Sequence, residues 1–169
     1  PVFITKIEDR NGIVLETVTP KTQEAMSKET ANIMVRMLQG VVDGVYNAST
    51  NKTLGTGVRL RYKYGFTNQM GGKTGTTQNH SDGYFMGITP NLVTGVWSGC
   101  EDRSVHFRDI LFGQGANMAL PVFAEYMQRV YADTTNTGVF PINFDIPKYI
   151  DQKLDCSHHM QTEENNEFE

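Results

Sequence analysis

The chain has 169 residues, of which 38% are hydrophobic and 20% are charged, and its net charge is −4. This length suffices for one domain, and the acidic balance gives no basic surface for nucleic acid. No apolar run approaches the ~20 residues that a membrane-spanning helix needs. The composition therefore argues against a nucleic-acid partner and against a membrane span within the chain.

The N-terminal third predicts a β-hairpin followed by a long helix. Strand-forming residues at 3–8 and 13–16 flank Asp9-Arg10-Asn11-Gly12, in which Asn-Gly is a strong turn signal. A helix is predicted from about Lys28 to Val45, with Ser27 as its N-cap. Its apolar residues recur at helical spacing and predict one core-facing stripe, formed by Met34, Leu38, Val41, Val42 and Val45.

The rest of the chain predicts a sheet and a second helix. A loop rich in glycine and threonine precedes three strands, at about 70–77, 84–88 and 93–99, which are expected to form an antiparallel meander with Pro90-Asn91 as a tight connection. A final helix is predicted at about 117–131, with one apolar face formed by Leu120, Phe123, Ala124, Met127 and Val130. The predicted fold class is α+β, an antiparallel sheet with helices packed against it.

The heptapeptide Gly71-Gly72-Lys73-Thr74-Gly75-Thr76-Thr77 lies in the first strand of this meander. Glycine tolerates the close approach of other groups, and threonine favours strands while offering a hydroxyl. The pattern therefore indicates a strand whose backbone a substrate approaches closely. Lys-Thr-Gly is also one of three signatures shared by penicillin-binding proteins and serine β-lactamases, in which the other two carry the nucleophile and a polar partner.

The flanking sequence extends this resemblance. The stretch from Lys73 to Pro90 runs on into Val93-Thr94-Gly95-Val96-Trp97-Ser98-Gly99, and it resembles the transpeptidase domain of class A penicillin-binding proteins, the bifunctional peptidoglycan synthases. Gly83 and Tyr84 stand where family members have alanine and tryptophan. The resemblance covers roughly residues 1–131, with further matches at 31–42, 55–57, 115–116 and 120–123.

The resemblance implies how each residue of the strand acts on a D-Ala-D-Ala stem peptide. Lys73 would lie beside the nucleophile, where it supplies positive potential and a link in the proton relay. The backbone N–H of Thr76 would be one of two oxyanion-hole donors, and the hydroxyls of Thr74 and Thr76 would bind the ligand carboxylate. Gly75 would leave the backbone open, and Thr77 completes the substrate-binding stretch. The implied ligands are peptidoglycan stem peptides and β-lactams, with no cofactor.

The sequence does not provide a separate nucleophile. Family members carry Ser-x-x-Lys at a helix start and a distinct Ser-x-Asn element, but both patterns match only Ser49-Thr50-Asn51-Lys52 here. One serine cannot fill both roles, and residues 53–57 predict a glycine-broken loop where Ser-x-x-Lys needs a helix. The chain is therefore expected to be the C-terminal part of a transpeptidase domain and to be inactive alone. The alternative is a non-catalytic half-domain or a degenerate module that binds peptides or β-lactams.

Nucleotide and metal binding are disfavoured by the residues themselves. Gly72-Lys73-Thr74 also ends a phosphate-binding loop, but that motif needs glycine where Thr67 stands, and a strand rather than a helix is predicted to follow. A tail cluster of Cys156, His158 and His159 lacks an evident fourth ligand, so no metal site is predicted.

The two cysteines, Cys100 and Cys156, are predicted to be free thiols, and neither His80 nor His106 is a candidate base. His80 is predicted to be exposed in a turn, because loops lie mostly on the surface. His106 belongs to a charged loop and is expected to be solvated or paired with Asp102 or Asp109.

The domain boundary is predicted near residue 132. Residues 1–132 would be the C-terminal part of the transpeptidase domain, and 133–169 a partly disordered extension, because periodicity stops after Asp133 and 161–169 is polar and acidic. The resemblance implies a parent protein that acts on the periplasmic side of the inner membrane and is anchored there upstream. It also implies that the upstream half of the domain packs on the meander, so an exposed strand edge and an apolar face are expected here.

Overall fold

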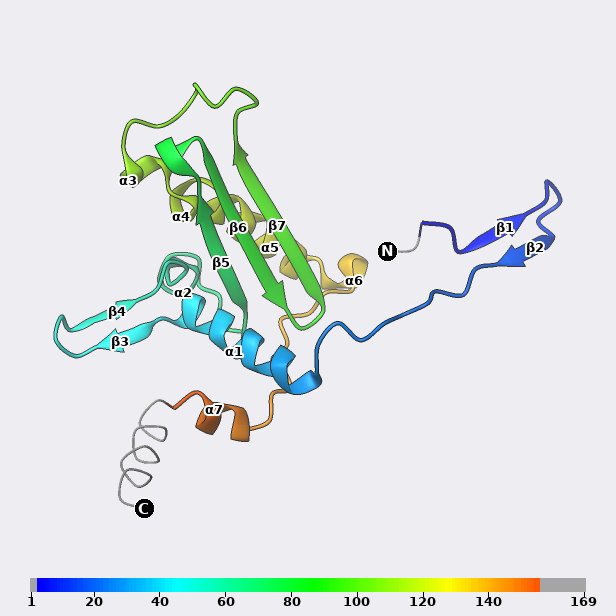
Figure 1. Ribbon diagram of the computed structural model, residues 1–169, viewed down its shortest axis with the longest axis horizontal. Coiled ribbons are helices and arrows are strands. Elements are labelled where there is room, and N and C mark those ends of the chain that lie inside the picture. Colours follow the sequence, from blue (N-terminus) through cyan, green and yellow to red (C-terminus); the bar gives the residue numbers. More distant parts are fainter. Residues whose placement is uncertain (1–2, 156–169) are drawn as a thin grey trace, which may run out of the picture.

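The computed structural model describes residues 3–155 and confirms the α+β fold, with a three-stranded antiparallel sheet at its centre (Figure 1). The strands are β5 (Gly71–Thr76), β6 (Asp82–Thr89) and β7 (Leu92–Gly99), in the order β5-β6-β7. Lys73 pairs with Met86 in the register of β5 with β6. The predicted meander is therefore present, although β6 starts two residues earlier than expected.

Helices cover one face of the sheet. Helix α4 (Gly115–Met118) and helix α5 (Leu120–Ala132) lie behind β5, β6 and β7 in Figure 1. The predicted apolar face of the last helix is confirmed, since its five residues are all buried: Leu120, Phe123, Ala124, Met127 and Val130. The ring of Phe123 packs against that of Phe85 in β6, with 4.8 Å between ring centroids.

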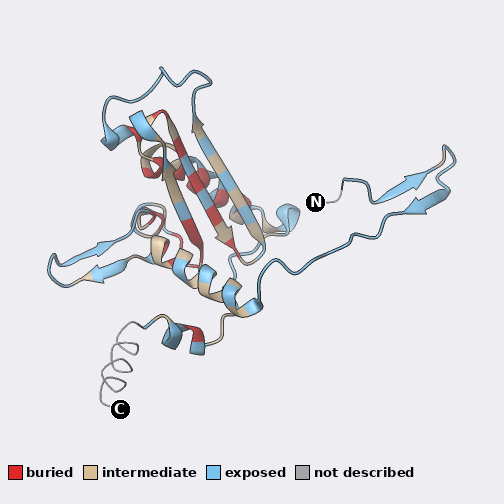
Figure 2. Ribbon diagram, in the orientation of Figure 1, coloured by how far each residue is buried: buried red, intermediate tan, exposed pale blue. Residues whose placement is uncertain are grey.

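The other face of the sheet is open except at the start of β5, where helix α1 (Lys28–Asp43) packs on Gly71. Residues of β6 alternate between buried and exposed, as expected for a sheet covered on one side only (Figure 2). On this face β6 and β7 together present four large apolar side chains with 41–68% of their surface exposed: Tyr84, Met86, Val93 and Trp97. An apolar sheet face of this kind is the surface expected from the sequence.

Helix α1 (Lys28–Asp43) begins as predicted and ends two residues early. The hydroxyl of Ser27 caps it by accepting a hydrogen bond from Thr30 N at 3.1 Å. Gly44 ends it with a φ of 76°, a conformation that suits glycine. Val45 then opens a hairpin of β3 (Val45–Asn47) and β4 (Lys52–Leu54), so the loop predicted to start at Thr53 is partly strand.

The predicted core stripe of this helix is wrong at two positions. Met34 is 46% exposed and Val45 is 68% exposed, whereas Val42 is fully buried. Gln39 is buried instead, with 1% of its surface exposed, because Arg36 of the same helix and Gln69 of the loop before β5 satisfy its amide. Helical spacing alone cannot identify such a residue, since its burial depends on those partners.

The predicted N-terminal hairpin is confirmed. Strands β1 (Lys6–Glu8) and β2 (Val14–Thr17) pair antiparallel and extend away from the sheet (Figure 1). The carboxylate of Asp9 accepts hydrogen bonds from the backbone N–H groups of Asn11 and Ile13, which closes the turn.

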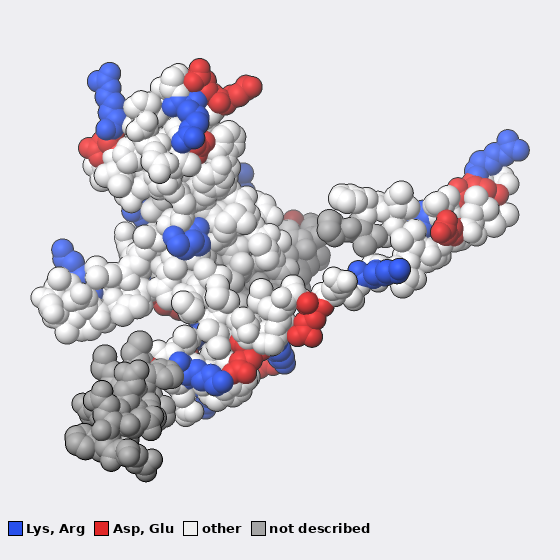
Figure 3. Space-filling view, in the orientation of Figure 1, with Lys and Arg blue, Asp and Glu red and all other residues white. Residues whose placement is uncertain are grey.

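Five short helices complete the description. They are α2 (Arg59–Tyr62), η1 (Gln78–His80), α3 (Ile110–Gly113), α6 (Thr134–Thr137) and α7 (Tyr149–Lys153). The cluster of Cys156, His158 and His159, predicted to bind no metal, lies outside the described residues. The tail at 161–169, predicted to be mobile, also lies outside them. Within residues 3–155 no helix has the length and apolarity to cross a bilayer. Positive and negative side chains are interspersed on the face in Figure 3.

Candidate functional site

Strand β5 forms one edge of the sheet. It pairs with β6 alone among the described residues, so the backbone groups on its other side have no strand partner. An unpaired edge can bind an extended peptide through main-chain hydrogen bonds. The strand continues through Thr76, without the helix that a phosphate-binding loop requires after its lysine.

The two glycines before Lys73 have a packing role. A Cβ at Gly71 would lie 3.0 Å from Leu38 Cβ in α1, and one at Gly72 would lie 2.6 Å from Phe85 Cζ. Both glycines are buried. The sequence pattern indicated close approach of a substrate at these positions, but it is α1 and the core that approach them. Gly75 is less buried, and a Cβ there would lie 3.2 Å from Tyr84 Cβ of the neighbouring strand.

Lys73 is exposed on β5, and its ammonium group donates a hydrogen bond to Thr74 O at 2.8 Å. In the described part of the chain no carboxylate forms an ion pair with it. Its charge is therefore available to an anionic ligand along the strand.

The hydroxyl of Thr74 donates to that of Thr56 at 3.0 Å. This contact joins the Gly55-Thr56-Gly57 loop to β5 across 18 positions of sequence. The loop is fixed on α1, because Gly57 N donates to Val41 O at 2.9 Å. Thr56 is thus a candidate site residue that was not predicted, although its flanking glycines and the family resemblance of residues 55–57 pointed to this loop.

The hydroxyl of Thr76 accepts a hydrogen bond from Gly115 N at 3.0 Å. Since the hydroxyl acts there as an acceptor, its own proton remains able to donate to a ligand oxygen. The contact also ties the end of β5 to helix α4. Thr76 is exposed, as a ligand-binding residue must be.

Thr77 and Asp82 close the turn after β5. Thr77 Oγ1 donates to Asp82 Oδ2 at 2.9 Å and accepts from Asp82 N at 3.0 Å. The Thr77 hydroxyl is therefore engaged in the turn. On the far side, Asp82 Oδ1 accepts from the Trp97 indole N–H at 3.0 Å, which links β6 to β7.

Hydrogen bonds from Trp97, Thr77 and Ser81 and the charge of Arg103 hold the pKa of Asp82 below its ordinary value of 3.8. The stability that these bonds give the folded state is present above pH 3.8 and is lost as the pH falls below 3.8 through the lower folded-state pKa. We expect the fluorescence of Trp97, the one tryptophan, to change in that range in wild type and not in Asp82→Asn, whose side chain does not titrate. An identical acid transition in the variant would contradict this assignment.

His80 is not the exposed turn residue that was predicted. It is half-buried, with a φ of 56°, and its Nδ1 is buried with no hydrogen-bond partner among the described residues. Gly113 packs on it so closely that a Cβ there would lie 2.3 Å from His80 Cβ. His80 lines a surface pocket of about 270 Å³ together with Cys100 and Phe107.

His106 is exposed, and its Nδ1 donates to Phe107 O at 2.9 Å. In the described part of the chain neither Asp102 nor Asp109 pairs with His106, and their carboxylates accept from Ser104 N and Leu111 N. Cys100 is an exposed free thiol, as predicted.

Ser49 lies in the turn of the β3–β4 hairpin, and Lys52 begins β4. The two side chains therefore do not share the face of a helix, which Ser-x-x-Lys requires. The hairpin projects away from the sheet (Figure 1). Within residues 3–155, no three His, Cys, Asp or Glu side chains come together as metal ligands.

The structure is an antiparallel sheet with helices on one face and Lys-Thr-Gly on its edge strand, and comparison with known proteins gives the family that has this arrangement. The model of the penicillin-binding protein transpeptidase domain matches residues 1–97. Penicillin-binding protein 1A of Aquifex aeolicus is 35% identical over 130 residues, which are 77% of this chain and 16% of that protein. The chain therefore belongs to the penicillin-binding protein transpeptidase family, and the class A resemblance is confirmed.

Two further relatives agree with this placement. Penicillin-binding protein 1A of Neisseria flavescens is 32% identical over 129 residues, 73% of this chain and 14% of that protein. The crystal structure of penicillin-binding protein 1A from Haemophilus influenzae has the same fold, with a TM-score of 0.55 at 23% identity over 79% of this chain and 24% of that one. The chain spans less than a fifth of the length of these curated relatives.

Proposed function

We propose that β5 is the ligand-binding wall of a serine D,D-transpeptidase domain, whose nucleophile lies in sequence upstream of Pro1. The observation that carries this proposal is the unpaired edge strand on which an uncompensated ammonium, that of Lys73, precedes the hydroxyls of Thr74 and Thr76. Such an edge suits an extended peptide that ends in a carboxylate. Membership of the family supports the same assignment.

The proposed reaction has two acyl-transfer steps. The upstream serine oxygen attacks the carbonyl between the two D-alanines of a stem peptide, the C–N bond breaks, and the terminal D-alanine leaves with the serine proton. An amine of a neighbouring peptidoglycan strand then attacks the acyl-serine ester and restores the serine hydroxyl. Lys73 stabilises negative charge and takes part in proton transfer, and Thr76 N–H donates to the oxyanion. A β-lactam acylates the same serine but has no leaving group that departs.

The open face of the sheet supports a partner within the same protein. Its exposed apolar side chains, Tyr84, Met86, Val93 and Trp97, form the kind of surface that another part of a fold covers. We propose that the upstream half of the domain packs there and brings the serine next to Lys73. The protein would act on peptidoglycan at the periplasmic face of the inner membrane, held by an upstream anchor.

Labelling with a fluorescent penicillin tests the proposal. The full-length protein that carries this sequence should form an adduct that survives denaturing electrophoresis, whereas the 169-residue chain alone should not. Labelling of the isolated chain that Ser49→Ala abolishes would instead make Ser49 the nucleophile. A full-length protein that binds stem peptides but never forms an adduct would be a binding module.

The two threonine hydroxyls can be tested separately in the full-length protein. Thr74→Val and Thr76→Val should each lower the second-order acylation rate by roughly 10- to 100-fold, the effect of one lost hydrogen bond to a charged group. Thr53→Val on the exposed hairpin is the matched control and should acylate normally. Stopped-flow measurement with a chromogenic β-lactam gives the rates. Equal rates in all three variants would remove the hydroxyls from the ligand site.

A further inference from the structure

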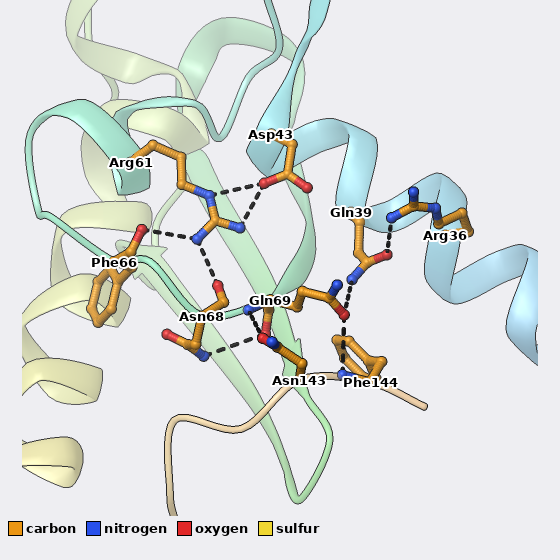
Figure 4. Close-up of polar contacts among 9 residues, drawn as sticks. All are labelled: Arg36, Gln39, Asp43, Arg61, Phe66, Asn68, Gln69, Asn143 and Phe144. Carbon is orange, nitrogen blue, oxygen red and sulfur yellow. Dashed lines mark hydrogen bonds and ion pairs between the residues drawn. The ribbon is translucent and has the colours of Figure 1, made fainter. Parts of the chain in front are cut away.

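Polar contacts from several segments hold the loop that leads into β5 (Figure 4). The Arg61 guanidinium donates to Phe66 O at 2.9 Å and to Asn68 O at 2.6 Å, and it also pairs with Asp43 at the end of α1. On the other side, Asn68 Nδ2 donates to the Tyr131 hydroxyl at 3.0 Å. The loop is therefore fixed to α1, α2 and α5 before the strand starts.

The last residue before Met70 has contacts with a segment much later in the chain. Gln69 N donates to Asn143 Oδ1 at 2.9 Å, and Gln69 Oε1 accepts from Phe144 N at 3.1 Å. The same oxygen accepts from Nε2 of the buried Gln39 at 3.2 Å. We call these four residues, Gln39, Gln69, Asn143 and Phe144, the Gln69 junction. It joins α1, the start of β5 and the C-terminal segment in one hydrogen-bonded group.

The start of β5 has little freedom to move independently of this junction. Met70 is fully buried, and a Cβ at Gly71 would lie 3.2 Å from Gln39 N. Lys73 follows two residues later on the same strand and faces the same side as Gly71, since side chains alternate along a strand. A displacement of Gln69 would therefore move Lys73 with it.

The C-terminal segment has its own attachment to α1. Ile150 in α7 is fully buried, Asp151 accepts from Arg36, and Lys153 pairs with Glu29. Residues 140–155 thus run from the junction to a second anchor on the same helix. We call these residues the C-terminal strap.

We propose that the C-terminal strap is a positioning element of the ligand-binding strand. Through Asn143 and Phe144 it fixes Gln69, and through Gln69 it sets where Lys73 lies relative to the helices of the domain. The catalytic consequence rests on the proposed function of β5. Asn143 is a positioning residue that has no contact with the ligand.

Asn143→Ala in the full-length protein tests the strap, with Asn136→Ala as matched control. Asn136 lies in α6 of the same C-terminal part, and among residues 3–155 its side chain bonds only to Asp133. We expect Asn143→Ala to speed hydrogen exchange in peptides covering 70–76 and to lower the second-order acylation rate roughly tenfold, less than the hundredfold that a displacement of about 1 Å can cost. The thermal midpoint should change by only a few degrees. Asn143→Asp, which keeps an acceptor oxygen for Gln69 N, should restore both quantities.

The results of these measurements support or overturn the positioning role of the C-terminal strap. Unchanged exchange and unchanged acylation in Asn143→Ala would overturn the proposal, as would a loss that Asn136→Ala reproduces. Faster exchange with wild-type acylation would overturn the positioning role while leaving the strap as an anchor. Absence of any adduct in the wild-type protein would refute the proposed function. The hydrogen-exchange data would then show by themselves whether the C-terminal strap anchors the start of β5.

Discussion

Replacing Lys73 with alanine in the full-length protein is expected to slow acylation by a β-lactam by roughly a hundredfold or more, the effect of losing an electrostatic or acid–base contributor. The physical reason is that the Lys73 ammonium is the charge on β5, and none of the described carboxylates neutralises it. Stopped-flow acylation rates give the measurement, with thermal melts to verify folding.

Two companion variants sharpen this test. Lys73→Arg keeps the positive charge but stays protonated, so a rate between those of wild type and Lys73→Ala would separate charge stabilisation from proton transfer. Lys52→Ala removes a lysine from the exposed hairpin and from the rival Ser49 motif, and it should acylate normally. A folded Lys73→Ala protein with the wild-type rate would make Lys73 structural.

Gly115→Ala is expected to destabilise the fold strongly. Its Cβ would lie 2.3 Å from Gly75 O and 2.5 Å from Tyr84 O, and both of these are backbone atoms of paired strands. Forcing extra volume into such a contact typically costs about 1–3 kcal/mol, and here it also threatens the bond from Gly115 N to Thr76. The free energy of unfolding in urea, measured on the full-length protein, should fall accordingly, and acylation should fall with it.

Gly40→Ala is the control for this effect. A Cβ at Gly40 would meet nothing within 4 Å, and the residue lies in helix α1. Alanine is favoured over glycine in a helix interior by about 0.5–1 kcal/mol, so this variant should be slightly stabilised. If Gly115→Ala were as stable as wild type, the close contact of α4 with the end of β5 would be wrong.

The elements with local signals were predictable from the sequence. Asn11-Gly12 and Pro90-Asn91 marked turns that the structure contains, and helical spacing identified the buried face of α5. The β3–β4 hairpin was missed because Val45 was assigned to the apolar stripe of α1, although Gly44 is a helix-ending signal.

The contacts that complete the candidate site were not predictable in this way. Thr56 reaches Thr74 across 18 positions of sequence, and Gln69 reaches Asn143 across 74. Residues with such contacts satisfy no local pattern, because their burial and orientation depend on a distant partner. Lys73 and its neighbours were predicted as site residues from the family resemblance, and the structure adds the contacts that surround them.

A crystal structure of the full-length protein acylated by a β-lactam would show whether β5 is the wall of the ligand site. We predict an ester to an upstream serine, with the lactam-derived carbonyl oxygen on Thr76 N–H and the ligand carboxylate on the hydroxyls of Thr74 and Thr76, beside Lys73. An adduct on Ser49, or a bound ligand that makes no contact with β5, would contradict this prediction.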